Sequence, residues 1–371
     1  MVEPTQARRP SNRNEFEIAI ICALSEEADA VKALFDVDWD LDRPFGRATG
    51  DTNIYSTGRI GIHNVVLVHL AGMGKINAAS GSARILCSYE NVRLGLVVGI
   101  CGGVPTIKAK KEVEKEVFLG DIVISTGVVQ YDLVRKFPNK AVTKDTLEDA
   151  LSRPNLEIRA FLQKIKGSTD QDRLKNTCRT QLTKLLGKQS FQKCRYPGDD
   201  KDILFPPAYR HKHQQPGGCD TCSRCNNDDD DTCDDARDST CEVLGCVAGL
   251  SNELTRRRDT NLGQPPPEPQ IYFGRIGSGD WVIKSGRDRD IIAKEHQLLA
   301  FEMEGGGVWD NVPTVVIKAV CDYADSHKNK AWQNYAAAVA ASCTGAFLQQ
   351  WPGPNKSLPA RPSPGKSLPF P

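Results

Sequence analysis

The sequence predicts an α/β fold in which a single three-layer domain, with a mixed central β-sheet flanked by helices, is interrupted by a long irregular insertion. Two observations predict this fold. Apolar runs alternate with helical and glycine-rich stretches in 16–136, and the same texture resumes in 271–350. Between them, 137–270 is rich in Lys, Arg, Gln, Asp, Pro and clustered Cys, a composition typical of loops.

The expected strands are near-continuous apolar runs, as in strands that are buried on both faces of a sheet. They are "FEIAIICAL" (16–24), "NVVLVHL" (64–70), "RLGLVVGI" (93–100), "DIVISTGVV" (121–129), "IYFGRIG", "LLAFEME" and "TVVIKAVCD". Helices are expected at 75–89, 155–166 and 331–350. In the first of these, the spacing places Ile76, Ala79, Ala83 and Cys87 on one face, which predicts that this face packs.

Composition limits the classes of partner. The chain has 371 residues, 26% of them charged, with a formal net charge of +1, which gives no argument for nucleic acid or a membrane surface as a partner. No stretch has the roughly 18 apolar residues of a membrane span, and the polar N-terminus is not a secretory signal. We therefore expect a cytoplasmic protein with reduced thiols, a disordered leader (1–15) and a disordered Pro-rich tail (351–371).

Acidic side chains follow several of the expected strands. Glu27 comes after the first run, Glu302 and Glu304 follow "LLAF", and Asp322 ends "TVVIKAVCD". Ligands of such sheets bind at the carboxyl ends of the strands, so these carboxylates are candidates for one site. An apolar setting at Asp322 favours a neutral acid that donates a proton to a leaving group.

Each acid also has a structural interpretation. Ser25 is a plausible N-cap, which would place Glu27 in a first helical turn where negative charge is favoured. Glu304 could begin a helix in the same way, or it could accept hydrogen bonds from the vicinal hydroxyls of a ribose. The glycine turns "AGMGK" (71–75) and "GICGG" (99–103) allow close backbone approach, but neither is a complete nucleotide-binding motif.

The order of these motifs resembles a known family. "EIAIICALSEEADAV", "AGMGKINAA", "VVGICGGV", "GDIVIS", "SGDWVI", "AFEMEGGGV" and "VIKAVCDYAD" are similar to the nucleoside phosphorylase superfamily, and most similar to its 5′-methylthioadenosine/S-adenosylhomocysteine nucleosidases. The insertion and "CDYADSHKNKAWQNYAAAVAAS" resemble divergent fungal members that form modules of NLR-type signalling proteins. The likeness spans 16–136 and 271–350.

The resemblance implies cleavage of the N-glycosidic bond of a purine nucleoside. Asp322 would protonate the purine at N7, Glu304 would hold the ribose hydroxyls with Met303 against the sugar, and Glu27 would activate water. The other positions of the implied substrate site are Gly102, Ile100, Val282, Ile283 and Lys318. The superfamily implies a homo-oligomer that needs no cofactor, with a purine nucleoside, adenosine-like, as its small-molecule partner.

Several positions depart from the family pattern. Lys318 stands where the nucleosidases carry an Arg that positions the acid. Val282 replaces an aromatic that stacks on the base, and the adjacent Trp281 should point to the other face if this segment is a strand. Phe205 and Tyr209, in the insertion, are candidates for an aromatic lid.

The sequence leaves two questions open: whether water or phosphate attacks the sugar, and whether the protein is an enzyme. Val97 and Ile100 stand where phosphorylases place an Arg and a Ser, and neither side chain can bind phosphate. This favours water over phosphate as the co-substrate. The alternatives are a phosphate-dependent phosphorylase and a non-catalytic nucleoside-sensing module of a signalling protein.

A cysteine cluster in the insertion has two interpretations. Cys219, Cys222 and Cys225 have zinc-knuckle spacing, and further candidate ligands are Cys233, Cys241, Cys246, His211 and His213. Tetrahedral Zn²⁺ in a structural role is one interpretation. The run of aspartates and the lack of a second CxxC favour the other, free thiols in a solvated loop. No metal is expected in the catalytic site.

Overall fold

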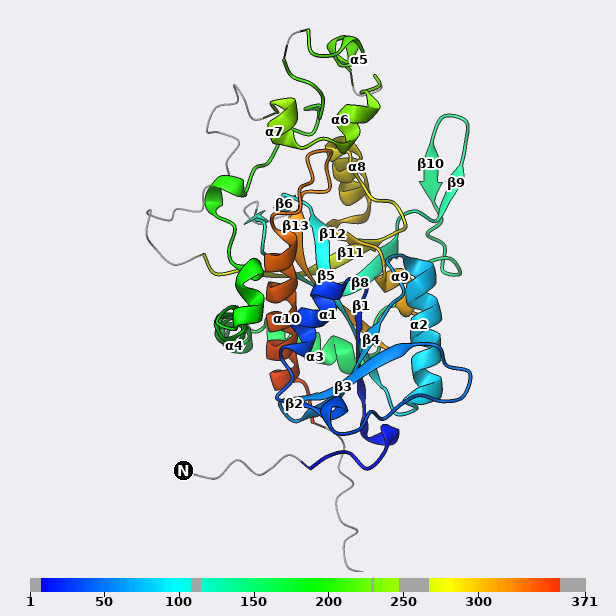
Figure 1. Cartoon of the computed structure of the whole chain (residues 1–371). Coiled ribbons are helices and arrows are strands. Elements are labelled where there is room, and N and C mark those ends of the chain that lie inside the picture. Colours follow the sequence, from blue (N-terminus) through cyan, green and yellow to red (C-terminus); the bar gives the residue numbers. More distant parts are fainter. Residues whose placement is uncertain (1–7, 108–114, 216, 228–229, 247–266, 354–371) are drawn as a thin grey trace, which may run out of the picture.

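The computed structural model describes residues 8–107, 115–215, 217–227, 230–246 and 267–353. A nine-stranded sheet crosses its centre in the order β12-β11-β8-β13-β5-β1-β4-β3-β2 (Figure 1). Helices cover both faces of this sheet, and the expected mixed α/β fold is confirmed. Among the described residues, no helix is long and apolar enough to cross a membrane.

The central strands are the apolar runs of the sequence. They are β1 (Ile18–Cys22), β4 (His63–His69), β5 (Leu94–Gly103) and β13 (Thr314–Asp322). β1 runs parallel to β4 and β5, and β13 runs parallel to β5. Because these strands are buried on both faces, hydrophobic residues follow one another without alternation. Their carboxyl ends meet at one edge of the sheet.

Strand β12 closes part of the sheet on itself. β8 (Ile122–Gln130), β11 (Ile271–Ser278) and β12 (Leu298–Glu302) lie beyond β13, and β11 is parallel to both of its neighbours. β12 also pairs with the end of β5, where Phe301 lies opposite Gly102. The segment that follows β12 is therefore brought next to the ends of β5 and β13. The far edge is formed by β3 (Ile54–Ile60) and β2 (Val37–Asp38).

The helices form the two outer layers. α1 (Ser25–Lys32) and α10 (Gln333–Gln350) contact each other on one side of the sheet, and α10 packs on β5 and β13. α2 (Lys75–Ser88) and α9 (Gly305–Val308) contact each other on the opposite side (Figure 1). α8 (Gly286–His296) packs on β11 and β12.

The predicted packing face of α2 is wrong. Ile76 is 80% exposed, and Ala83 and Cys87 are exposed as well. The face that packs carries small residues, among them Ala78 and Ser82, because α9 approaches closely there: a Cβ on Gly307 would lie 2.2 Å from the carbonyl oxygen of Lys75. The spacing of Ile76, Ala79, Ala83 and Cys87 therefore selected the wrong face of this helix.

Part of the segment expected to be irregular is helical and belongs to the core. α3 (Leu156–Lys166) coincides with the expected helix. α4 (Ser168–Leu186) was not expected, and it packs on α10 through a buried stripe. This stripe is Leu174, Cys178, Leu182 and Leu185. The expectation of an irregular segment outside 155–166 is thus wrong for 168–186.

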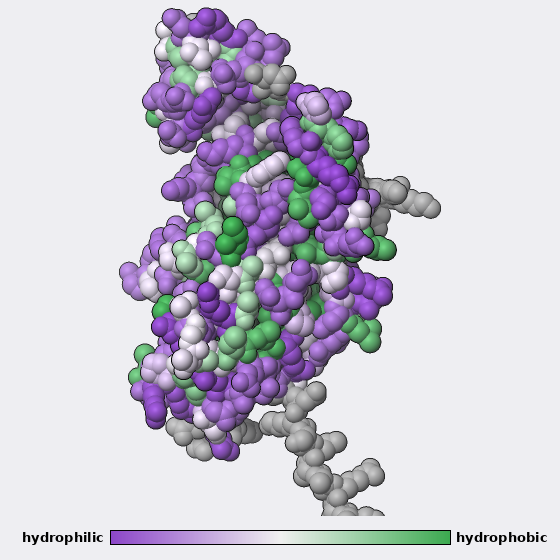
Figure 2. Space-filling model, turned by 90° about the vertical axis from the view of Figure 1, so that its right-hand side faces the viewer, coloured by the Kyte–Doolittle hydropathy of each residue, from purple (hydrophilic) through white to green (hydrophobic). Residues whose placement is uncertain are grey.

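The other described residues of the insertion form only short elements. We call residues 203–246 the lobe; it contains α5 (Asp220–Arg224), α6 (Asp234–Asp238) and α7 (Cys241–Leu244). The lobe protrudes at the top of Figure 1, and its face in Figure 2 is mainly hydrophilic. α8 and the loop after β13 lie beneath it.

Described residues near the two ends of the chain, within the expected leader (1–15) and tail (351–371), make defined contacts. Arg13–Glu15 form a 3-10 helix, and the Arg9 guanidinium donates a hydrogen bond to the carbonyl of Trp39. Trp351 is buried, and its ring contacts Phe161. Residues 1–7 and 354–371 lie outside the described residues.

Candidate active site

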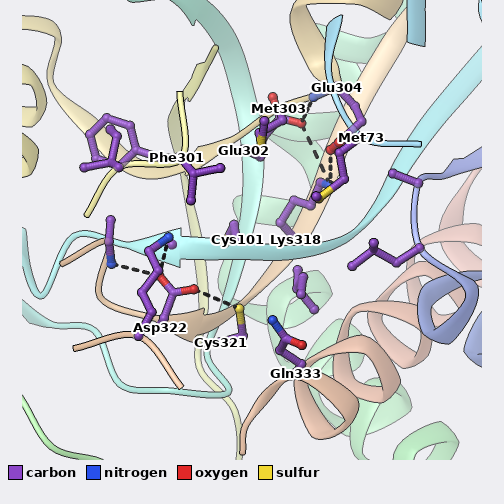
Figure 3. A pocket seen from close by; sticks show the side chains of 18 of the residues that line it. Met73, Cys101, Phe301, Glu302, Met303, Glu304, Lys318, Cys321, Asp322 and Gln333 are labelled. Atoms are coloured by element: carbon purple, nitrogen blue, oxygen red, sulfur yellow. Dashed lines mark hydrogen bonds and ion pairs between the residues drawn. The ribbon is translucent and has the colours of Figure 1, made fainter. Parts of the chain in front are cut away.

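A cavity of about 210 Å³ opens at the carboxyl edge of the central strands. All nine residues that the sequence marked for the site line it: Glu27, Ile100, Gly102, Val282, Ile283, Met303, Glu304, Lys318 and Asp322. In Figure 3, Glu304 and Met303 lie at one side of this cavity, and Asp322 and Cys321 lie at another. The fold thus brings together three acids that are far apart in the sequence.

Glu27 is held by backbone N–H groups. Its Oε2 accepts hydrogen bonds from the backbone nitrogens of Ala23 and Leu24, each at 3.0 Å, and its Oε1 accepts one from Ile100 at 2.9 Å. Burial raises the pKa of the Glu27 carboxyl, and Lys318 opposes this rise. Glu27 therefore has the restricted geometry and the raised proton affinity of a general base.

Gly99 makes room for this carboxylate. A Cβ on Gly99 would lie 1.8 Å from Glu27 Oε1 and 2.2 Å from its Cδ, distances that no side chain tolerates. The stretch 99–103, expected to be a glycine turn, is the last part of strand β5. Gly99 therefore has a steric function within the strand: it lets Glu27 dock against it.

The two acids after β12 have different environments. Glu302 accepts hydrogen bonds from the backbone nitrogens of Glu304 and Gly305 at the start of α9, so it stabilises that helix start. Glu304 is also buried, but its Oε2 contacts Lys318 Nζ at 2.9 Å. Among the described residues, its Oε1 accepts one long bond of 3.4 Å from the backbone nitrogen of Gly74. Oε1 is the oxygen with spare capacity to accept hydrogen bonds.

Lys318 lies at the centre of this group of acids. It is 1% exposed, and its Nζ lies 3.9 Å from Glu302 Oε2 in addition to the contact with Glu304. Burial by itself would lower the pKa of the ammonium, but Glu304, Glu27 and Glu302 together raise it above its usual value. Lys318 therefore stays charged and balances buried negative charge.

The contact of Asp322 is with another lysine. Lys318 was expected in place of the Arg that positions the acid, but Asp322 Oδ1 lies 3.1 Å from Lys328 Nζ. Oδ1 also accepts the backbone N–H of Ala324 at 2.8 Å, and Ala324 has a left-handed φ of 51°. A Cβ on Gly102 would lie 2.9 Å from the Ala324 Cβ. Gly102 and this tight turn together set the position of the Asp322 carboxylate.

Other lining residues were missed or misplaced by the sequence analysis. Trp281 was expected to point away, but β11 ends at Ser278, and Trp281 and Val282 both line the cavity from a loop. Phe301, Met73 and Gln333 line it as well. Met73 lies in the turn 71–75, where the sequence analysis considered only the glycines. Gln333 begins α10, and the sequence did not indicate which face of that helix points toward the site.

The expected aromatic lid is absent from the cavity lining. Phe205 and Tyr209 do not line the cavity. Phe205 is instead buried in the lobe, where its ring stacks on His327 with 3.8 Å between centroids. Two groups of Cys and His side chains that could hold a metal ion also lie outside the cavity, in the lobe and at His327.

Comparisons with known proteins agree with the fold and the motifs. Residues 17–178 match the family model of the Phosphorylase superfamily. A nucleotide-binding leucine-rich repeat (NLR)-like protein of Hyaloscypha variabilis is 29% identical over 355 residues, which cover 92% of this chain and 30% of that protein. A 5′-methylthioadenosine/S-adenosylhomocysteine nucleosidase of Mycobacterium bovis is 24% identical over 341 residues, which cover 90% of this chain and 96% of that protein.

Solved structures share the architecture. The 5′-methylthioadenosine/S-adenosylhomocysteine nucleosidase of Helicobacter pylori superposes with a TM-score of 0.52 at 15% identity, covering 91% of this chain and 99% of that one. The futalosine hydrolase of Helicobacter pylori superposes with a TM-score of 0.52 at 14% identity, covering 91% and 98%. At these identities the likeness is one of fold. Together, the family model over 17–178, the relatives and the shared fold show that this chain is similar to the phosphorylase superfamily.

Proposed function

We propose that the protein hydrolyses the N-glycosidic bond of a purine nucleoside. One observation carries this proposal: Glu27, Glu304 and Asp322, from three separate parts of the chain, line one cavity together with Met303. Glycosidic cleavage needs an acid for the leaving group and a base for the nucleophile, on different sides of the sugar. The cavity of about 210 Å³ that these side chains line provides the space for a substrate.

Each carboxylate has one role in this reaction. Asp322 donates a proton to N7 of the purine while the bond between C1′ of the ribose and N9 breaks. The water oxygen bonds to C1′, and the water proton goes to Glu27. The products are the free purine base and the free sugar. Glu304 Oε1 accepts hydrogen bonds from the ribose hydroxyls, while Lys318 holds Oε2 in place.

Lys328 is the positioning residue for the acid in this proposal. It contacts Oδ1 of Asp322, whereas Oδ2 is contacted by Cys321 Sγ at 3.3 Å. The rings of Phe301 and Trp281 and the side chain of Ile283 give the cavity apolar surface for a purine. For the base we propose adenine, because the Mycobacterium bovis relative is a 5′-methylthioadenosine/S-adenosylhomocysteine nucleosidase.

Water fits the cavity better than phosphate. The backbone nitrogen of Ile100, near the carboxyl end of β5, already donates to Glu27 and is not free to bind an anion. A doubly charged phosphate beside the buried Glu27 and Glu304 carboxylates would be repelled. Phosphorolysis is the alternative, and it predicts ribose 1-phosphate as a product.

The test is a panel of adenosine, inosine and 5′-methylthioadenosine, incubated with and without phosphate, with products separated by chromatography. We expect the free base and the free sugar in phosphate-free buffer, and at least a 100-fold lower rate for Asp322→Asn. Glu26→Gln is the matched control, because Glu26 is the exposed neighbour of Glu27. Binding of a nucleoside without any cleavage would replace the proposal with the sensing function.

A further inference from the structure

Two groups of four Cys and His side chains assemble in and under the lobe. In each group of the described residues, the potential ligand atoms lie within 4.8 Å of one another. Site I consists of His211, Cys241, Cys246 and His327, and site II of His213, Cys219, Cys222 and Cys233. We propose that each group binds one Zn²⁺ ion, and that site I ties the lobe to the loop that carries Asp322.

The distances in site I are those of a tetrahedron around zinc. The Nδ1 atoms of His211 and His327 are 3.3 Å apart, and Cys241 Sγ lies 3.7 Å and 3.5 Å from them. Cys246 Sγ lies 3.6 Å from His211 Nδ1. Bonds of about 2.0 Å to nitrogen and about 2.3 Å to sulfur separate two tetrahedral nitrogens by about 3.3 Å, and a nitrogen from a sulfur by about 3.6 Å.

Both imidazoles of site I are already oriented for a metal. His211 Nε2 contacts the carbonyl of Ser239 at 2.9 Å, and His327 Nε2 contacts that of Tyr209 at 3.1 Å. A carbonyl only accepts, so each Nε2 carries the proton and each Nδ1 presents a lone pair. Two lone pairs facing each other at 3.3 Å repel unless a cation lies between them. Outer hydrogen bonds of this kind orient the histidine ligands of metal sites.

Site II repeats the same geometry. Cys222 Sγ and Cys233 Sγ are 3.7 Å apart, and each lies 3.6 Å from His213 Nδ1. The other ring nitrogen of His213 contacts Asp235 at 3.2 Å, a carboxylate partner that zinc-bound histidines commonly have. A sulfur–sulfur distance of 3.7 Å is far longer than the roughly 2.05 Å of a disulfide. Cysteine-rich tetrahedral ligand sets favour Zn²⁺ among common divalent ions.

The described residues of the lobe form only a small hydrophobic core. Its buried cluster consists of five side chains, and two of them, Cys222 and Cys246, are proposed ligands. So small a core does not hold some forty residues in one conformation, and small domains of this kind usually rely on a metal or on disulfides. The sequence alone favoured free thiols because of the aspartate run and the lack of a second CxxC. His327, the ligand that completes site I, lies far along the chain and was not among the expected ligands.

Site I has a consequence for the catalytic loop. His327 follows Asp322 by five residues and immediately precedes Lys328, the residue that contacts Asp322 Oδ1. Between Asp322 and His327 the chain makes a turn in which Asp325 Oδ1 accepts the backbone N–H of His327 at 2.9 Å. A metal at site I therefore fixes the end of the loop that positions the acid. This consequence rests on the proposed function, whereas the two zinc sites do not.

The test counts zinc in the full chain after the affinity tag is removed, by plasma mass spectrometry with sulfur as the measure of protein. We expect two Zn²⁺ per chain, and one each in His327→Ala and His213→Ala. Cys225→Ser is the matched control and should keep two, because Cys225 belongs to neither group. Less than one Zn²⁺ per chain, or disulfides among these cysteines in peptide mapping, would overturn the proposal.

A second variant covers the case in which His327→Ala fails to fold. His327→Cys keeps a zinc ligand at site I, so it should retain two metals. After Co²⁺ substitution, its thiolate-to-cobalt absorption should rise relative to the wild-type chain, and unchanged absorption would overturn site I. In nucleoside cleavage, His327→Ala should lower kcat at least tenfold more than His213→Ala. Equal effects would overturn the coupling to Asp322 but leave the metal count standing.

Discussion

Replacing Lys318 with Met tests whether this lysine holds the buried acids together. Lys318 is 1% exposed and contacts Glu304 at 2.9 Å and Glu302 at 3.9 Å. Methionine has a similar length and no charge, so the substitution leaves three buried carboxylates without a cation. Removal of one partner from a buried ion pair costs about 3–5 kcal/mol of folding free energy. At about 2 °C per kcal/mol for a chain of this size, Tm should fall by about 6–10 °C.

The loss of stability in Lys318→Met should become smaller as pH falls. Without Lys318, the folded state keeps Glu27 and Glu302 protonated to higher pH than the unfolded chain does, because burial already raises the pKa of both carboxyls and the opposing lysine is gone. The folded state then binds more protons, so its stability increases as pH falls. The difference in Tm between the variant and the wild type should therefore be large at pH 8 and smaller at pH 5.5, measured by differential scanning fluorimetry.

A matched control separates this effect from the loss of any lysine. Lys32→Met removes a lysine whose side chain is 43% exposed and which contacts Asp38 at 3.3 Å. Surface pairs of this kind contribute at most about 1 kcal/mol. If Lys318→Met is as stable as Lys32→Met at pH 8, or if the difference in Tm widens toward pH 5.5, the electrostatic reasoning is wrong.

Three further predictions concern activity. Gly99→Ala pushes a Cβ into Glu27 and should reduce kcat at least 100-fold, since misplacement of a catalytic group by about 1 Å has effects of that size. Gly127→Ala is the control and should leave kcat unchanged, because a Cβ there would meet nothing within 4 Å. Equal rates for the two variants would contradict the steric role of Gly99. Because burial raises the pKa of Glu27, kcat/KM should fall with decreasing pH at a midpoint above the ordinary value of about 4.3, and a profile that stays flat down to pH 4.5 would exclude Glu27 as the base. Lys328→Ala removes the lysine contact of Asp322 Oδ1 and should lower kcat about tenfold with KM little changed. A rise in KM at constant kcat would instead show that Lys328 contacts the substrate.

The sequence predicted those parts of the fold that are governed by local pattern. Continuous apolar runs such as 93–100 identified the central strands, since only strands buried on both faces lack polar alternation. The position of acids at strand ends was enough to group Glu27, Glu304 and Asp322, because parallel strands end at one edge.

What could not be predicted depends on contacts between distant segments. α4 presents a single narrow apolar stripe on a polar helix, and only the presence of α10 opposite explains its burial. The pairing of Asp322 with Lys328 rather than Lys318 depends on the tight turn at Ala324, which no residue pattern indicated. The same holds for His327, which joins ligands more than eighty positions earlier in the chain.

The most direct measurement is single-turnover cleavage of a radiolabelled purine nucleoside in phosphate-free buffer, for the wild-type chain and for Asp322→Asn, Glu27→Gln and Glu26→Gln. The account predicts release of free base and free sugar by the wild-type chain and by Glu26→Gln, with losses of at least 100-fold in the other two variants. Equal rates in all four proteins, or no cleavage by any of them, would contradict it.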